Sequence, residues 1–228
     1  MRNRLAHRGL PGLLWAVAVA VIAGCRTVPV QPPPTASQPW DVTRSELQAA
    51  DHFQLKGRVA VATGKDGFNA ALRWTQAGAR SQVSLQGPLG VGGVQITADG
   101  DTLNVVTSRG DHLDSDAARA ELGDRLGFDP PLGSLRYWIL GVPDPAMPSK
   151  ETVDPQQQRL QSLQQDGWQI DYGGYMPTGI GPTGMGSAAN GPTGNGAPGN
   201  GAGASLPAKM TVQRSGVRVR LIVDGWTS

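Results

Sequence analysis

Apolar and polar residues alternate between positions 53 and 107 of the chain. Strict alternation at a period of two predicts strands with one buried face and one solvated face. Turn residues rich in glycine interrupt the pattern about every ten residues, which is typical of an antiparallel meander. The five predicted strands carry their apolar residues at Phe53 to Val61, Phe68 to Trp74, Val83 and Leu85, Val94 and Ile96, and Leu103 and Val105.

Helical spacing replaces this alternation in three places. Thr43–Glu46 matches a capping box and predicts the start of a first helix there. Ala118, Leu122 and Leu126 recur every four residues, and Gly127 can end that second helix. A third helix is predicted around Leu135–Ile139. Each has one apolar side, which suits a helix that covers an open face of a sheet.

Alternation returns in the C-terminal third of the chain. Leu160 and Leu163 are spaced oddly for a strand, so the segment 160–164 is predicted as a strand or as a short helix. Asp166-Gly167 is a hairpin signal, and alternating residues follow it up to Tyr172. Further strands are predicted around Met210–Val212 and Val217–Val223.

These elements predict a mainly β fold with about eight to eleven antiparallel strands and three short helices. A strongly curved sheet or partly closed barrel of that size can enclose a ligand cavity. Periodicity alone favours a plain hydrophobic core as the simpler alternative. The residues expected to line a cavity are Phe53, Leu55, Phe68, Leu72, Trp74, Val83, Leu85 and Ile96.

The first residues have the pattern of a secretory signal peptide. Three arginines precede an apolar stretch that ends at Ile22-Ala23-Gly24-Cys25. This ending resembles the lipobox of bacterial lipoproteins, which implies that residues 1–24 are removed and that Cys25 is lipidated. The alternative is an ordinary signal peptide with a chance cysteine.

Residues 25–42 are expected to form the lipidated N-terminus and a tether. Five prolines lie between Val28 and Pro39, and in polyproline geometry this stretch can extend up to roughly 40 Å. Arg26 stands where bacterial lipoproteins retained at the inner membrane typically carry aspartate. By resemblance to that sorting rule, the protein is expected on the periplasmic face of the outer membrane, anchored through Cys25.

Charge and cysteine content narrow the function classes. The formal net charge of +2 becomes −1 when Arg2, Arg4 and Arg8 are removed with residues 1–24, so nucleic-acid binding loses its main support. Cys25 is the only cysteine of the chain. This excludes a disulfide framework and a cysteine zinc site in the mature protein.

No arrangement of residues typical of catalysis is present in the sequence. Only His52 and His112 follow the signal peptide, and neither a Gly-x-Ser-x-Gly elbow nor paired histidines occur. We therefore expect a protein that is not an enzyme and that holds neither a metal nor a cofactor. The alternatives left open are a structural envelope lipoprotein without a ligand and an anchored envelope hydrolase with an unusual active site.

Residues 176–205 form an insert rich in Gly, Pro, Asn and Ala. Pro-Thr-Gly occurs in it three times, and no charged residue lies between Tyr172 and Ala208. Such a composition buries too little apolar surface to offset the entropy of ordering. It predicts a disordered loop between two paired strands.

Several segments together resemble the LolB family of the bacterial lipoprotein localisation pathway. They are Leu55–Val61, Phe68–Gln76, Gly87–Gly90, Leu135–Pro143, Asp166–Tyr175, Leu206-Pro207 and Val219–Trp226. The most specific is Leu135–Pro143, with its Trp-Ile-x-Gly-x-Pro pattern, and the main departure is the long insert.

The resemblance implies an unclosed antiparallel β-barrel over residues 43–228, with helices covering a lipid-binding cavity to which Trp138 also contributes. It implies a monomeric receptor that takes lipidated client proteins from a LolA-like periplasmic carrier and delivers them to outer-membrane lipid.

One turn carries an apolar tip. Pro88, Leu89 and Gly90 connect two predicted strands at a place where Asn or Asp is usual. From the residues alone, two explanations are open for Leu89 besides contact with a membrane. Its side chain can fold back on the barrel rim, or it can be a tolerated lone apolar residue. Resemblance to the family implies that this loop acts in delivery of clients to the membrane.

Overall fold

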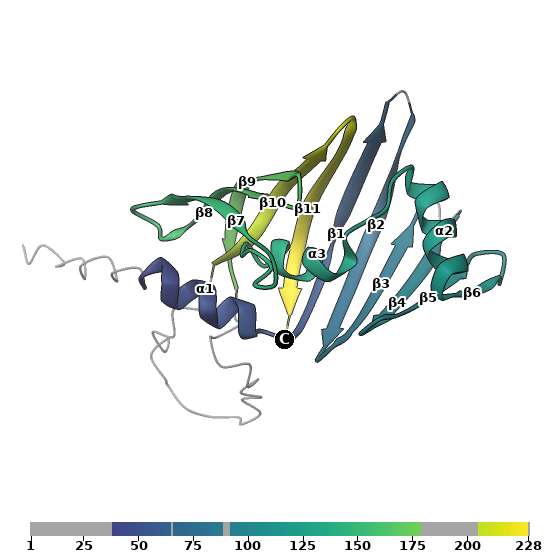
Figure 1. Ribbon diagram of the computed structural model, residues 1–228, viewed down its shortest axis with the longest axis horizontal. Coiled ribbons are helices and arrows are strands. Elements are labelled where there is room, and N and C mark those ends of the chain that lie inside the picture. The colour runs from purple at the N-terminus through teal and green to yellow at the C-terminus, as the bar shows by residue number, and fades with distance from the viewer. Residues whose placement is uncertain (1–37, 65, 89–91, 179–204, 228) are drawn as a thin grey trace, which may run out of the picture. The chain divides into compact units, whose positions relative to one another are not determined.

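The computed structural model describes residues 38–64, 66–88, 92–178 and 205–227. This part of the chain contains eleven strands in one antiparallel sheet, in the order β6-β5-β4-β3-β2-β1-β11-β10-β9-β8-β7 (Figure 1). β6 and β7 are its two edges, so the curved sheet stays unclosed. The mainly β class and the number of strands expected from the sequence are confirmed.

The strands are β1 (His52–Thr63), β2 (Asp66–Ala77), β3 (Arg80–Gln86), β4 (Val94–Asp99), β5 (Thr102–Thr107), β6 (His112–Asp114), β7 (Ser149–Asp154), β8 (Arg159–Gln165), β9 (Trp168–Pro177), β10 (Ser205–Arg214) and β11 (Val217–Thr227). The helices are α1 (Trp40–Ala49), α2 (Ser115–Leu126) and α3 (Leu132–Trp138).

Alternation in the sequence sets the buried face of the meander. Trp74 on β2 lies opposite Val83 on β3, and Val83 lies opposite Ile96 on β4. All three are buried, whereas the residues directly before and after each of them along its strand are more exposed. Cross-strand pairs of this kind stabilise a sheet and fix its register. They give the sheet a continuous apolar face.

A β-bulge bends the sheet at Gly57. The pairing of β1 with β11 shifts its register between Lys56 and Gly57. A Cβ atom at position 57 would lie 2.4 Å from the carbonyl oxygen of Ile222, so only glycine fits there. Bulges increase the local bend and twist of a strand, which contributes to the curvature of the sheet.

A second bulge explains the unusual spacing of leucines in β8. Thr152 pairs with Ser162 and the next residue, Val153, pairs with Leu160, so Gln161 is the extra residue. Leu160 and Leu163 are therefore both buried although three positions separate them. The segment is a strand, which decides between the two alternatives that the sequence left open.

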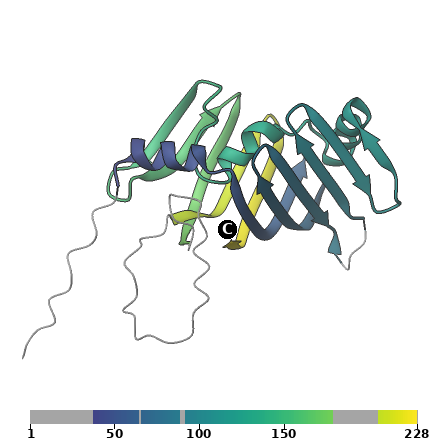
Figure 2. The ribbon, with the colours of Figure 1, turned by 90° about the horizontal axis from the view of Figure 1, so that it is seen from below.

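α2 and α3 lie against one face of the curved sheet, as two perpendicular views show (Figures 1 and 2). Gly127 ends α2 as expected, since its φ of 74° is in the left-handed region and its amide donates to the carbonyl of Gly123. None of the helices in the described part of the chain is long and apolar enough to cross a bilayer.

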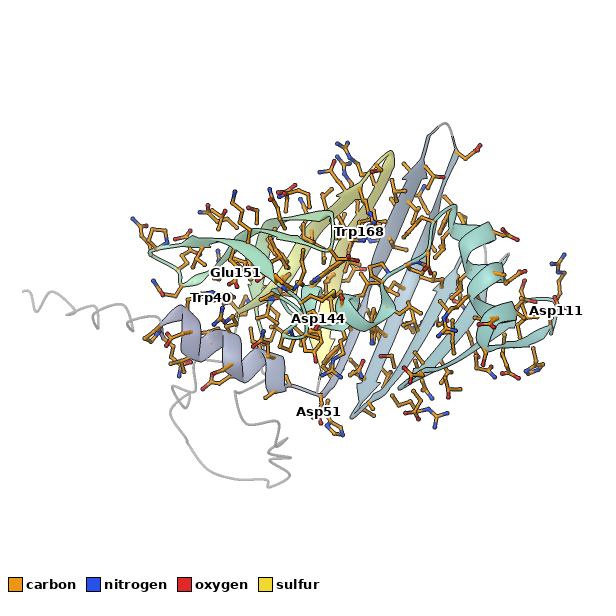
Figure 3. The ribbon with its side chains drawn as sticks, viewed as in Figure 1. Trp40, Asp51, Asp111, Asp144, Glu151 and Trp168 are labelled. Atoms are coloured by element: carbon orange, nitrogen blue, oxygen red, sulfur yellow. The ribbon has the colours of Figure 1, made fainter. Side chains whose placement is uncertain are left out.

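The predicted capping box at Thr43 is wrong. α1 begins at Trp40, after Pro39, and no side chain caps it. Contacts with the β7–β8 hairpin set this earlier start (Figure 3). The amide of Trp40 donates to Gln158, and its indole Nε1 donates to Glu151 at 2.8 Å. Long-range contacts therefore override the local signal.

Residues 37–228 form one compact unit. Every strand pairing and every buried apolar residue of the described core fall within it. The unit thus has its own core, as expected of a domain that folds by itself. The predicted signal peptide (1–24) and the tether (25–42) up to position 37 lie outside the described residues.

The ends of the predicted insert are strand residues. Pro177 on β9 pairs with Ser205 on β10, and Met176 pairs with Leu206. Met176, Pro177 and Ser205, which the composition assigned to the insert, therefore belong to the sheet. Residues 179–204, on which the expectation of disorder falls, lie outside the described residues.

Candidate functional site

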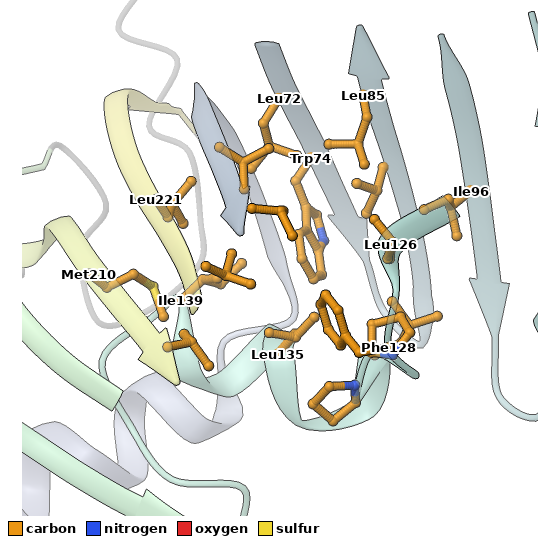
Figure 4. A pocket seen from close by; sticks show the side chains of 18 of the residues that line it. Leu72, Trp74, Leu85, Ile96, Leu126, Phe128, Leu135, Ile139, Met210 and Leu221 are labelled. Carbon is orange, nitrogen blue, oxygen red and sulfur yellow. The ribbon is translucent and has the colours of Figure 1, made fainter. Parts of the chain in front are cut away.

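A cavity of about 120 Å³ lies between the apolar face of the sheet and the chain segment from α2 to Ile139 (Figure 4). Strands β1–β4 and β9–β11 form one wall, and the end of α2, the α2–α3 connection and α3 form the other. Every described residue that lines it is aliphatic, aromatic, proline or methionine. They are Val59, Val61, Phe68, Leu72, Trp74, Val83, Leu85, Ile96, Leu126, Phe128, Pro130, Pro131, Leu132, Leu135, Ile139, Trp168, Met210, Val212, Val219 and Leu221.

Six of the nine residues expected in a cavity line this one. They are Phe68, Leu72, Trp74, Val83, Leu85 and Ile96. Phe53 and Leu55 are buried but are not among the lining residues. Phe53 instead packs edge-on against Trp226, with 5.9 Å between the ring centroids.

Trp138, the third expected residue that does not line the cavity, belongs to a buried polar network. Its indole Nε1 donates to Gln165 Oε1 at 2.8 Å, and the amide of Asp144 donates to the same oxygen. Gln165 Nε2 donates back to the carbonyls of Asp144 and Met147. The hydroxyl of Ser134 donates to the Asp144 carboxylate. This network fixes α3 and the following loop to β8.

Close packing explains the glycine of the Leu135–Pro143 segment. Gly141 has a φ of +82°, and a Cβ there would lie 3.0 Å from Pro207 Cγ. Beside it, Tyr172 donates its hydroxyl to the carbonyl of Trp138, and Tyr175 donates to that of Leu160. Burial raises the pKa of both tyrosines above the usual range. The hydrogen bond of Tyr172 thus ties the end of α3 to β9, and that of Tyr175 ties β9 to β8.

The remaining lining residues were not among those that the sequence pattern predicted for the cavity. Those on β1, β10 and β11, such as Val59, Met210 and Leu221, recur at every second position of their strands. The same period-two signal could therefore have identified them. Phe128, Pro130 and Pro131 lie in the α2–α3 connection, which has no periodicity, so no local signal marks them.

The Pro-Leu-Gly loop begins where β3 ends. Leu89 and Gly90 lie outside the described residues, and Pro88 is exposed. Pro88 and Gly92 border a groove of about 340 Å³ that shares Phe68, Leu85 and Leu126 with the cavity. The two ends of the loop thus border a groove that adjoins three side chains of the cavity wall.

Among the residues that the structure describes, none that lines the cavity carries an acid, a base or a nucleophile. Among the described residues, no group of three or more His, Cys, Asp or Glu side chains could hold a metal ion. The cavity can accordingly bind apolar matter, but its walls offer no group for general acid–base or nucleophilic catalysis.

The sequence is similar to that of known proteins. The family model for outer membrane lipoprotein LolB matches residues 51–184, which is more than half of the 228 residues. The outer-membrane lipoprotein LolB of Nitrosococcus oceani is 29% identical over 212 residues, covering 92% of this chain and 94% of its own. That of Ectopseudomonas mendocina is 27% identical over 188 residues, covering 82% and 80%.

Among solved structures, a LolA superfamily protein from Nitrosomonas europaea aligns with a TM-score of 0.45 and 12% sequence identity. The alignment covers 86% of this chain and 94% of that one. From the match over residues 51–184, we conclude that the chain belongs to the LolB family.

Proposed function

We propose that the protein is an outer-membrane receptor that binds the acyl chains of lipoproteins in its cavity and inserts these clients into the outer membrane. The clients would come from a LolA-like periplasmic carrier, and the receptor would act as a monomer. Family membership supports a role in outer-membrane lipoprotein localisation and transport rather than catalysis. The observation that carries the proposal is the wholly apolar lining of the cavity.

Acyl chains suit such a lining because their transfer from water is strongly unfavourable. Each methylene contributes about 0.8 kcal/mol, so a long chain represents on the order of 10 kcal/mol that a receptor must shield. Since no energy source takes part, the transfer runs downhill from carrier to receptor to bilayer. The cavity must then bind chains better than the carrier does, yet weakly enough for release.

The cavity has to widen to take a long chain. Its volume is about 120 Å³, whereas pockets for drug-sized ligands are roughly 300–1,000 Å³. Phe128 to Leu132 are only partly buried or exposed, while Trp138 to Val142 are fully buried. We therefore assign the movement to the α2–α3 connection. The polar network around Gln165 keeps the far end of α3 in place.

Figure 4 shows the side chains whose positions this movement would change. Phe128 and Leu135 project from the helical side toward Trp74 and Leu85 on the strands. Displacing the connection would withdraw Phe128 from this space, and an acyl chain could take its position. The groove beside Pro88 would then offer a continuous apolar path toward the loop that carries Leu89.

Attachment to the membrane would depend on Cys25. Two or more acyl chains on this residue would suffice for stable anchoring on the periplasmic face of the outer membrane. We expect a Cys25→Ala variant to leave the outer-membrane fraction when cell envelopes are separated. Mature protein with unmodified Cys25 would contradict the anchor.

The cavity itself can be tested with two neighbouring residues of β11. Leu221 is buried and lines the cavity, whereas Ile222 is exposed on the other face. In residues 37–228 expressed without an anchor, we expect Leu221→Trp to weaken binding of a fluorescent palmitoyl probe at least ten-fold. Ile222→Trp should leave it unchanged.

Circular dichroism would verify that both variants stay folded, since overpacking costs about 1–3 kcal/mol. If the unmodified domain binds no acyl probe, the structural lipoprotein without a ligand becomes the better explanation. If the domain cleaves the probe, the anchored envelope hydrolase becomes the better explanation.

A further inference from the structure

Five tryptophans lie in the described part of the chain, and four of them donate their indole N–H to a partner. Trp40 donates to Glu151, Trp74 to Gln76, Trp138 to Gln165 and Trp226 to the carbonyl of Pro207. The indole nitrogen of Trp168 is buried without any hydrogen-bond partner. Buried donors in folded proteins are nearly always paired, so an unpaired one calls for an explanation.

Trp168 lines the cavity, at the start of β9. Its side chain contacts both the α2–α3 connection and a charged residue at the surface. The ring centroid of Phe128 lies 5.7 Å away, edge to face, and the guanidinium carbon of Arg214 lies 5.6 Å from the indole ring. The side chain of Arg214 is 48% exposed. Trp168 therefore lies between the apolar cavity and a solvated cationic group.

The cavity contains a second indole, that of Trp74, but its N–H is already occupied by Gln76 Oε1 at 3.1 Å. No other residue of the lining has a side chain with an N–H or O–H group. Trp168 is thus the one lining side chain with a free donor among the described residues. A ligand with an acyl chain in this cavity would bring with it the carbonyl oxygen at the head of the chain, which is a stronger acceptor than an ether or ester alkoxy oxygen.

We propose that the indole N–H of Trp168 donates a hydrogen bond to the carbonyl oxygen of a bound fatty-acyl ester or amide. This inference rests on the proposed function and adds a specificity-determining contact to it. The chain would lie among the aliphatic residues, and the carbonyl would lie at the end of the cavity that Arg214 marks. Phe128, which packs against the indole in the closed cavity, would give way when the α2–α3 connection moves.

The contact predicts that the cavity distinguishes an ester from an ether. We would measure binding of 1-monopalmitoylglycerol and of 1-O-hexadecylglycerol, which lacks the carbonyl, to residues 37–228. The unmodified domain should bind the ester on the order of five-fold more tightly, the effect of one hydrogen bond. Trp168→Phe should remove this preference, because the ester should lose more affinity than the ether. Trp74→Phe is the matched control, because it also changes a lining indole but should keep the preference.

A second measurement does not depend on the stability of the variants. In the ¹⁵N–¹H spectrum of the unmodified domain, the indole resonance of Trp168 should shift downfield with the ester and not with the ether. Equal binding of both probes, or an ester preference that survives in Trp168→Phe, would overturn the inference and leave the proposed function standing. Equal binding would mean that the N–H is satisfied by an aromatic face such as that of Phe128. Binding of neither probe would overturn both.

Discussion

Trp138 on α3 and Gln165 on β8 are joined by a buried hydrogen bond of 2.8 Å across 27 positions of the sequence. The same Gln165 oxygen accepts a hydrogen bond from the backbone amide of Asp144. The side-chain Nε2 of Gln165 donates to two backbone carbonyls. One side chain thereby fixes the end of α3 and the loop after it to the sheet. α3, which bounds the cavity, is therefore held in place at its C-terminal end.

Gln165→Leu should lower the free energy of unfolding by roughly 2–4 kcal/mol, because the substitution leaves two buried N–H groups without acceptors. Urea unfolding of residues 37–228 would measure this loss. Gln164→Leu is the control, since Gln164 is the exposed neighbour on the same strand, and it should change stability little. A similar small effect of both substitutions would contradict the role given to the network.

The two buried tyrosines predict a loss of stability in alkali. Burial raises the pKa of Tyr172 and Tyr175 in the folded state, whereas an unfolded tyrosine titrates near 10. A group whose pKa is raised by folding stabilises the protein fully below the unfolded pKa, and this stabilisation is lost as the pH rises above it. The free energy of unfolding should fall by up to about 1.4 kcal/mol per pH unit for each tyrosine between pH 10 and 11. In a double Tyr→Phe variant, urea unfolding should show a shallower fall over this range.

Shortening the insert should have little effect. Pro177 and Ser205 are paired neighbours at the ends of β9 and β10, so a short turn can connect them. Replacing residues 178–204 with Asn-Gly should change stability by about 1–2 kcal/mol at most, because the entropy of loop closure depends weakly on length. We expect binding of the palmitoyl probe and delivery of clients to stay near normal. Lost delivery by a folded variant would show that the insert contacts a partner.

Leu89→Glu should separate acceptance from delivery. If Leu89 enters the bilayer, a charge there opposes insertion of the loop but leaves the cavity intact. The variant should accept lipidated clients from the carrier at a near-normal level and fail to transfer them to liposomes. Leu89→Ile, which stays apolar, should transfer normally. Loss of acyl-chain binding or of stability in Leu89→Glu would instead assign Leu89 to the cavity or the core.

The sequence by itself determined most of the strands and the face that each of these strands buries. A period of two is a local property, since neighbouring side chains of a strand point to opposite faces whatever lies above them. The meander from Phe53 to Val105 could be predicted for this reason, as could six of the lining residues. Gly127 at the end of α2 was equally readable, because a left-handed residue after a helix favours glycine.

Only the tertiary structure decided which buried residues face the cavity and which are packed against other elements. Phe53 and Phe68 carry the same signal in the sequence, yet Phe53 packs against Trp226 and Phe68 lines the cavity. Alternation says that a side chain is covered, but what covers it depends on residues far along the chain. The same holds for the indoles of Trp138 and Trp168. Gln165 forms a hydrogen bond with the first, whereas no described residue forms one with the second.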